Sequence, residues 1–156
     1  MSVDVKPVAV AEVSEQLKQL LTLAAVAGES KAFVWTSFVK EGYHCFPEAG
    51  VLPEFKTGDE YDVSHLANKH MHYFHFKVYI SVNHDNRDIE FIQLRRWLIS
   101  LYDDNTLELN NKSCEMIARD LCLAIDTRWP GASIIVDVSE ENISGAMVTY
   151  QRPMFS

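Results

Sequence analysis

The chain has 156 residues, 47% of them hydrophobic and 23% charged, which is typical of a single globular domain. Its net charge of −8 argues against binding to nucleic acid or anionic membranes, and no apolar run approaches the ~20 residues that span a bilayer. Three cysteines without a CxxC pair, together with the lack of a secretory signal pattern, exclude a disulfide framework and indicate a cytoplasmic protein.

The first predicted element is an amphipathic helix over residues 8–27. Its apolar residues recur at helical spacing and polar residues fill the positions between them, while Gly28 ends the pattern. We interpret residues 1–30 as an N-terminal helical extension that covers a sheet or forms an oligomer contact. Residues 31–156 form the main domain.

Two strands and a long loop follow the extension. Residues 32–40 are rich in β-branched and aromatic side chains, and residues 70–83 alternate between two faces, so both are predicted strands. The polar stretch 48–64 between them contains glycine and proline and is predicted to be a loop. Loops of this length are usually functional.

The second half of the domain is predicted to contain two helices and then two more strands. The helices cover residues 89–102, with Asp88 as the cap, and 113–128; the strands cover 133–139 and 145–150. The order strand–strand–helix–helix–strand–strand predicts an α+β fold. We expect a four-stranded antiparallel sheet with both helices on one face.

The strand 70–83 carries the most informative pattern. His70 and His72 share a face with a run of apolar residues, whereas His75 points to the opposite face. Two imidazoles on one face at the start of a strand favour metal chelation at the rim of the sheet. The alternative is that they are ordinary histidines that form hydrogen bonds.

The order of several short motifs resembles the family of 6-pyruvoyl-tetrahydropterin synthase and 6-carboxy-tetrahydropterin synthase, which has the tunnelling fold. The resemblance covers about residues 32–150. It rests on the order and spacing of the following segments: His44, His70-Met71-His72, Glu90-Phe91, Leu109-Asn110, Lys112-Ser113-Cys114-Glu115-Met116-Ile117-Ala118 and Val136-Asp137-Val138-Ser139-Glu140-Glu141.

The resemblance implies a Zn²⁺ ion held by His44, His70 and His72, with the fourth position left for water or substrate. It also implies that Glu140 grips the amino-pyrimidine ring of a pterin through a bidentate pair of hydrogen bonds. Glu115 is either a further substrate contact or only a carboxylate at a helix start. Glu140 has a comparable alternative, a solvated turn carboxylate beside Glu141.

The sequence departs from the family pattern where protons are transferred. The family's lyases have a catalytic cysteine shortly before the His-x-His, but the segment Asp62–Lys69 contains none. The Asp-His pair ahead of Leu-Asn is also missing, and Asp104 lies near its place. His65 could replace the missing base, because imidazole titrates near neutrality, or be a plain loop histidine.

Three hypotheses for function therefore remain. The first is a zinc-dependent carbon–oxygen lyase or related isomerase that acts on a pterin or deazapurine precursor, with His65 or Asp104 as the catalytic base. The second is a non-catalytic member that binds metal and a pterin or purine-like molecule. The third is a structural protein whose histidines bind no metal. The resemblance also implies a homo-oligomer, such as a hexamer, in which sheets close into a barrel and sites lie at subunit contacts.

Overall fold

The computed structural model describes residues 14–15, 18–19 and 30–153, and the chain divides into two units, residues 1–31 and 32–156. Of the predicted helix 8–27, four residues are described: Ser14, and the helical Glu15, Lys18 and Gln19. The Lys18 amide donates to the Ser14 carbonyl at 3.0 Å, and Glu15 and Lys18 form an exposed ion pair at 2.6 Å. The rest of that prediction lies outside the described residues. The account that follows concerns the second unit.

The second unit contains a five-stranded sheet with the order β3-β1-β2-β4-β5. Its strands are β1 (Phe33–His44), β2 (His70–Ser81), β3 (Leu107–Asn110), β4 (Ile134–Glu140) and β5 (Ser144–Tyr150). The pairs β1–β2, β2–β4 and β4–β5 are antiparallel, whereas β3 runs parallel to the end of β1. The sheet is therefore mixed.

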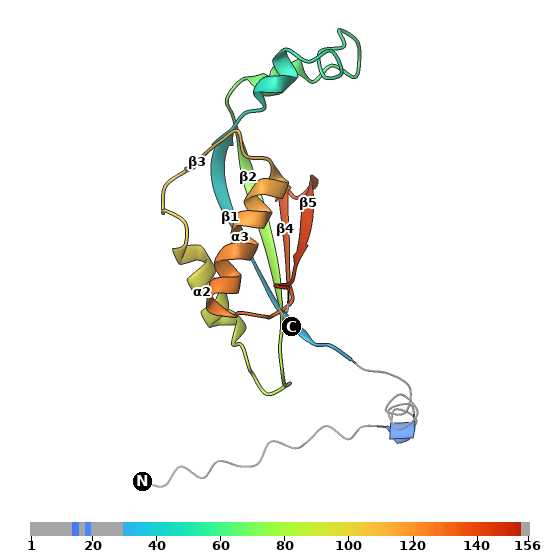
Figure 1. Cartoon of the computed structure of the whole chain (residues 1–156), viewed down its shortest axis with the longest axis vertical. Helices are drawn as coiled ribbons and strands as arrows, with labels where there is room; N and C mark the ends of the chain where they lie inside the picture. Colours follow the sequence, from blue (N-terminus) through green and yellow to red (C-terminus); the bar gives the residue numbers. More distant parts are fainter. Residues whose placement is uncertain (1–13, 16–17, 20–29, 154–156) are drawn as a thin grey trace. The chain divides into compact units, whose positions relative to one another are not determined.

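Two helices, α2 (Phe91–Ser100) and α3 (Cys114–Arg128), lie on the same face of the sheet (Figure 1). The α+β class and the placement of both helices on one face agree with the sequence prediction. The cap of α2 was predicted wrongly: Glu90, not Asp88, accepts hydrogen bonds from the amides of Ile92 and Gln93. Asp88 instead closes the preceding turn by accepting two hydrogen bonds from Asn83.

The predicted four-stranded antiparallel sheet was wrong because a fifth strand, β3, joins its edge. This strand has only four residues, of which Leu107 and Leu109 are buried. Such a short segment shows too little alternation to be recognised as a strand. Its parallel pairing with Gly42 and Tyr43 is a tertiary contact that no local pattern encodes.

The first strand extends to His44, four residues beyond its predicted end at residue 40. Gly42 lies within this extension, where a glycine ordinarily weakens a strand. Here a side chain has no space, because a Cβ on Gly42 would lie 2.9 Å from Leu109 Cδ1 and 3.0 Å from the Phe74 ring. The glycine thus lets β3 and the core approach the end of β1, and the strand continues to His44.

The core lies between the sheet and the two helices. Strand β2 contributes Phe74, Phe76, Val78 and Ile80, which are almost completely buried and belong to the face predicted from their alternation. The remaining core side chains come mainly from α2, α3 and β4. Burial of each large apolar side chain stabilises a fold by about 1.5–3 kcal/mol, so this layer holds the strands rigidly.

The predicted loop 48–64 contains part of two 3₁₀ turns, η1 (Pro47–Gly50) and η2 (Ser64–Ala67). The amide of Phe46 donates to the carbonyl of Leu66 at 2.8 Å, which ties the two ends of this connection together. In Figure 1 the connection projects from the end of the sheet at which β1 ends and β2 begins.

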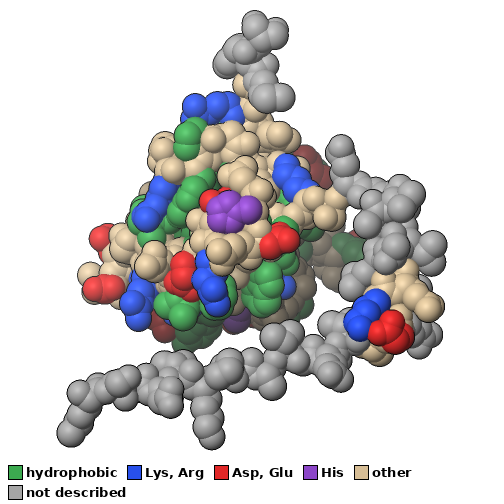
Figure 2. All heavy atoms as spheres, turned by 90° about the horizontal axis from the view of Figure 1, so that it is seen from below, with side chains coloured by type: hydrophobic (Ala, Val, Ile, Leu, Met, Phe, Trp, Pro, Cys, Tyr) green, Lys and Arg blue, Asp and Glu red, His purple; other side chains and the backbone are tan. Residues whose placement is uncertain are grey.

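The described surface carries charges of both signs. Figure 2 views the molecule from below and shows Lys and Arg side chains interspersed with Asp and Glu over the described part of that face. Among the described residues, no helix combines the length and the apolar character that crossing a membrane requires.

Candidate metal centre

Three histidines meet at the end of the sheet where β1 ends and β2 begins. His44 is the last residue of β1 and pairs directly with His70, the first residue of β2. His72 follows two residues later on the same face. One ring nitrogen from each histidine lies within 4.8 Å of the others, so the cluster could hold a metal ion. The sequence analysis predicted this set.

Each of the three rings has its Nδ1 nitrogen beside an oxygen that can only accept a hydrogen bond. Nδ1 lies 3.1 Å from the Lys112 carbonyl in His44, 2.7 Å from the Asn68 carbonyl in His70, and 3.4 Å from Glu141 Oε1 in His72. These acceptors place the proton on Nδ1 and leave the Nε2 lone pair of a neutral ring free. The same arrangement orients histidine ligands in metalloproteins.

The Nε2 atoms of His44 and His72 are fully buried, and neither has a hydrogen-bond partner among the described residues. A buried polar atom without a partner costs about 1–3 kcal/mol, so native proteins rarely retain one without a reason. A cation between the rings would use these lone pairs. The orphaned nitrogens therefore fit a metal ion better than they fit an ordinary hydrogen-bonding role.

Glu141 belongs to the candidate site but was not predicted. With Asn142 it forms the centre of the β4–β5 turn, and both have positive φ, 54° and 56° respectively. This conformation costs a non-glycine residue about 1–2 kcal/mol. It turns the carboxylate back to the Tyr73 amide, which donates to Glu141 Oε1 at 2.9 Å, and toward His72. A pair of adjacent acidic and amide residues after a strand was the only available signal.

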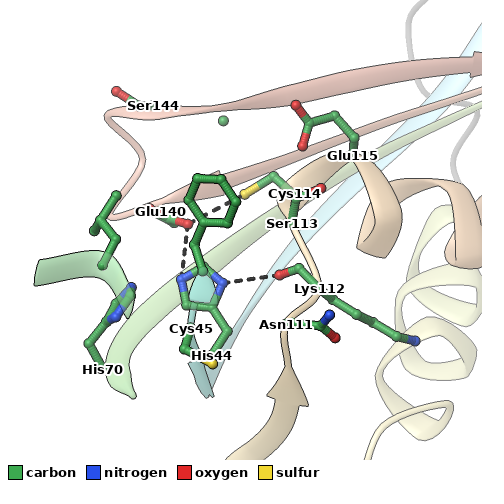
Figure 3. A pocket seen from close by; sticks show the side chains of 13 residues that line it. His44, Cys45, His70, Asn111, Lys112, Ser113, Cys114, Glu115, Glu140 and Ser144 are labelled. Carbon is green, nitrogen blue, oxygen red and sulfur yellow. Dashed lines mark hydrogen bonds and ion pairs between the residues drawn. The ribbon is translucent and has the colours of Figure 1, made fainter. Parts of the chain in front are cut away.

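A cavity of about 280 Å³ adjoins the histidines, and Figure 3 shows the side chains that line it. Its walls come from the end of β1, the turn η2, the start of α3 and the β4–β5 hairpin. His44, His70, Glu115 and Glu140 line it, together with Cys45, Phe46, Leu66, Asn111, Lys112, Ser113, Cys114, Ser144 and Gly145. The centre is thus open to a small molecule on one side.

Glu140 and Glu115 were both predicted as substrate contacts, and both line the cavity. Glu140 approaches the metal centre: Oε1 lies 3.3 Å from His44 Nε2, and Oε2 lies 3.5 Å from His72 Nε2. Glu115 is exposed in the first turn of α3. A hydrogen bond from the Ser113 side chain and one from its own backbone amide lower the pKa of Glu115.

Cys114, predicted only as a packing residue, is buried as expected and also lines the cavity. Its thiol lies 3.8 Å from Glu140 Oε1 and donates a weak hydrogen bond to it. Burial, followed by the nearby charge of Glu140, raises the pKa of Cys114 to about 12. The sulfur is therefore a neutral thiol near neutral pH and does not replace the missing family cysteine as a base.

The two residues predicted to transfer protons lie apart from the described cavity lining. His65 is exposed on η2, next to Leu66, which does line the cavity. Asp104 lies in the α2–β3 connection and lines a different depression, beside Lys40 and Thr106. The structure thus brings together the predicted metal ligands and both glutamates, but not the predicted bases.

Comparisons with known proteins do not assign the chain to a family. Neither the protein-family models nor the curated proteins give a match to the chain.

Proposed function

We propose that the chain is a cytoplasmic, zinc-dependent tunnelling-fold enzyme, similar to the 6-pyruvoyl- and 6-carboxy-tetrahydropterin synthases, that acts on a pterin or deazapurine precursor. The observation that carries the proposal is the convergence of His44, His70 and His72, each with Nδ1 held by an acceptor. Three neutral imidazoles with one open position are the ligand set of catalytic zinc sites.

Bound zinc would supply Lewis acidity, which polarises a substrate carbonyl or hydroxyl and acidifies the neighbouring C–H bond. The chain's own residues would then orient the substrate in the adjoining cavity. Glu140 is the candidate anchor for the amino-pyrimidine edge, because a carboxylate accepts two parallel N–H bonds from such an edge. Glu115, exposed on the cavity wall, is the candidate contact to a polar substituent.

A second candidate function is a non-catalytic member that binds the metal and the heterocycle without turnover. The position of the predicted bases favours it: His65 and Asp104 do not line the cavity, and the Cys114 thiol is held protonated. Carbon–oxygen lysis requires a group that removes a proton within hydrogen-bond reach of the substrate. The lyase therefore requires a base from His65 after movement of its turn, or from a neighbouring subunit.

A homo-oligomer is part of the proposal. Among the described residues, β3 and β5 are the edge strands of the sheet and pair on one side only, and proteins usually cover such edges. The face away from the helices exposes large apolar side chains on three strands, among them Trp35, Val39, Tyr73 and Met147. Closure of several sheets into a barrel, for example in a hexamer, would pair the edges. Light scattering that gives a monomer of 17.8 kDa would exclude this part.

The proposal is tested first by metal content. Protein purified without a histidine tag is expected to contain close to one zinc per chain, and His44→Asn, His70→Asn and His72→Asn each to contain far less. His75→Asn, which changes a histidine on the opposite face of β2, is the matched control and should retain the metal. A zinc content below about 0.2 per chain in the wild-type protein would exclude the centre, because sites of this type bind zinc tightly.

The zinc-loaded protein then distinguishes the two functions. Incubation with dihydroneopterin triphosphate, followed by chromatographic detection of the product, is expected to show turnover if the chain is a lyase. Binding of the pterin, measured by calorimetry, without product formation would support the non-catalytic member. Absence of both binding and turnover at full zinc loading would exclude a pterin as the ligand.

A further inference from the structure

Glu140 lies in a position that substrate binding alone does not explain. It is the last residue of β4, and its carboxylate faces the buried Nε2 atoms of His44 and His72 at 3.3 and 3.5 Å. Neither nitrogen makes a hydrogen bond with it. Figure 3 shows this carboxylate joined by dashed lines to the His44 ring and to Cys114.

These contacts are unfavourable unless a cation lies between the groups. Because the Nδ1 atoms face acceptors, the Nε2 atoms present lone pairs to the carboxylate oxygens, which are also electron-rich. Two protonated rings would instead form charge-assisted hydrogen bonds, which are typically about 2.7–2.9 Å long. The observed separations are longer and make no hydrogen bond.

The separations do match those between ligands of one metal ion. Two donor atoms that bind the same tetrahedral zinc at ~2.0–2.1 Å are about 3.3 Å apart. The distances from Glu140 Oε1 to His44 Nε2, 3.3 Å, and from Glu140 Oε2 to His72 Nε2, 3.5 Å, are each close to this value, with one carboxylate oxygen facing each ring. The Cys114 thiol donates a weak hydrogen bond to Glu140 Oε1, which favours this orientation of the carboxylate.

We propose that Glu140 is the fourth ligand of the metal centre in the resting protein and closes the position that a substrate would occupy. The inference rests on the proposed metal site. Glu140 contacts two of the three imidazoles, so coordination of one ion by all four groups requires Glu140 and His70 to approach each other.

As a consequence, Glu140, the residue proposed to bind the substrate ring, would also control access to the fourth position of the metal centre. A heterocycle with an amino-pyrimidine edge offers two N–H donors, which compete with the metal for the same carboxylate. When Glu140 moves to the heterocycle, the fourth metal position opens at that moment, next to the bound molecule. Without such a ligand the site remains four-coordinate and closed to water and small anions, as structural zinc sites are.

Cobalt(II) substitution tests this directly, because the visible absorption of cobalt reports coordination and requires no turnover. The protein is loaded with Co²⁺ and titrated with azide, a small anion that binds an open metal position. We expect azide to perturb the wild-type spectrum only weakly and to bind Glu140→Gln at least about tenfold more tightly. Glu140→Gln should also bind Co²⁺ more weakly, by about tenfold or more, because an amide oxygen is a poorer ligand than a carboxylate.

Glu48→Gln is the control, since it removes one negative charge from an exposed position of η1 that is outside the described cavity lining. It should behave as the wild type in both titrations, and circular dichroism should show that each variant is folded. Equal azide affinity in the wild type and Glu140→Gln, with cobalt bound to both, would overturn the ligand role but leave the three-histidine site intact. Failure of the wild-type protein to bind cobalt or zinc would overturn both proposals.

Discussion

Two carboxylates lie near opposite ends of α3, and they differ in how their charge is balanced. Asp126, near the end of the helix, is buried but accepts hydrogen bonds from Arg152, Tyr150 and the Gly131 amide. Glu140, beside the first residue of the helix, faces two imidazole nitrogens that donate nothing to it and one weak thiol donor. Arg152 balances the first charge, whereas no Lys or Arg side chain among the described residues pairs with the second.

The pKa of Asp126 shows this balance. Burial raises it, but hydrogen bonds from Arg152 and Gly131 and the charge of Arg152 lower it by more, so that its pKa lies below the ordinary value. A folded-state pKa below the unfolded value stabilises the protein above the unfolded pKa, and this stabilisation is lost as the pH falls through the folded pKa. Asp126 and its partners thus stabilise the fold without a ligand, whereas the three histidines and Glu140 would stabilise it only with a bound metal ion.

The largest effect is expected from Arg152→Met, which removes the balancing charge and leaves Asp126 ionised in a buried position. We expect the Tm, measured by circular dichroism, to fall by roughly 10 °C, with zinc content unchanged. Asp120→Asn, which removes a carboxylate from the exposed pair with Lys112, is the control and should shift the Tm by no more than about 2 °C. An unchanged Tm in Arg152→Met would show that Arg152 does not balance Asp126.

Glu141→Ala tests whether Glu141 orients the His72 ring in the metal centre. Loss of the carboxylate beside His72 Nδ1 removes the acceptor that fixes the ring, and such changes typically weaken metal binding by about 10–100-fold. Competition titration with a zinc chelator measures this affinity. Asn142→Ala, at the neighbouring position of the same turn with φ also positive, should retain near-wild-type affinity. Equal losses in both variants would assign the effect to the turn, not to the carboxylate.

A smaller effect is expected on the rate at which the Cys114 thiol is chemically modified, and this rate reports on the environment of Glu140. Because its pKa is raised to about 12 by burial and then by Glu140, only about one molecule in 1,000 carries the thiolate at pH 9. We expect iodoacetamide to modify it at least about tenfold more slowly than free cysteine, even after allowance for the greater nucleophilicity of a high-pKa thiolate. Peptide mapping by mass spectrometry gives its rate separately. Modification as fast as free cysteine would contradict the raised pKa.

Asp62 provides the smallest effect, as a half-buried carboxylate whose partners are all local. Hydrogen bonds from the Ser64 side chain and from the amides of Gly58 and Ser64 lower its pKa to about 2. The folded-state pKa is the lower one, so its contribution is complete above about pH 4 and fades as the pH falls towards 2. The protection of the Gly58 amide, that is, its exchange rate relative to an unstructured peptide at the same pH, should fall across that range in the wild type. Asp62→Asn should remove this pH dependence.

The sequence predicted those features that depend on local patterns. The alternation after His72 identified the buried face of β2, and the resemblance, through the order of its motifs, identified His44, His70 and His72 as candidate metal ligands. The missed features depend on contacts between distant residues. The strand β3 pairs with β1 across about 65 residues, and Glu141 reaches His72 only because two residues adopt positive φ. The His65 and Asp104 assignments followed the resemblance, which fixed their places in the chain but not in space.

The three acceptors at Nδ1 also set the order in which the centre can assemble. His70 and Asn68 are two residues apart, so their contact can form in a short peptide, but the partners of His44 and His72 lie 68 and 69 residues away. Closing such loops carries an entropic cost that only the packed sheet and α3 can offset. An unfolded chain therefore lacks two of its three oriented ligands. Metal affinity is then a property of the finished fold, and zinc at 100 times its Kd would add about 2.7 kcal/mol to the free energy of unfolding.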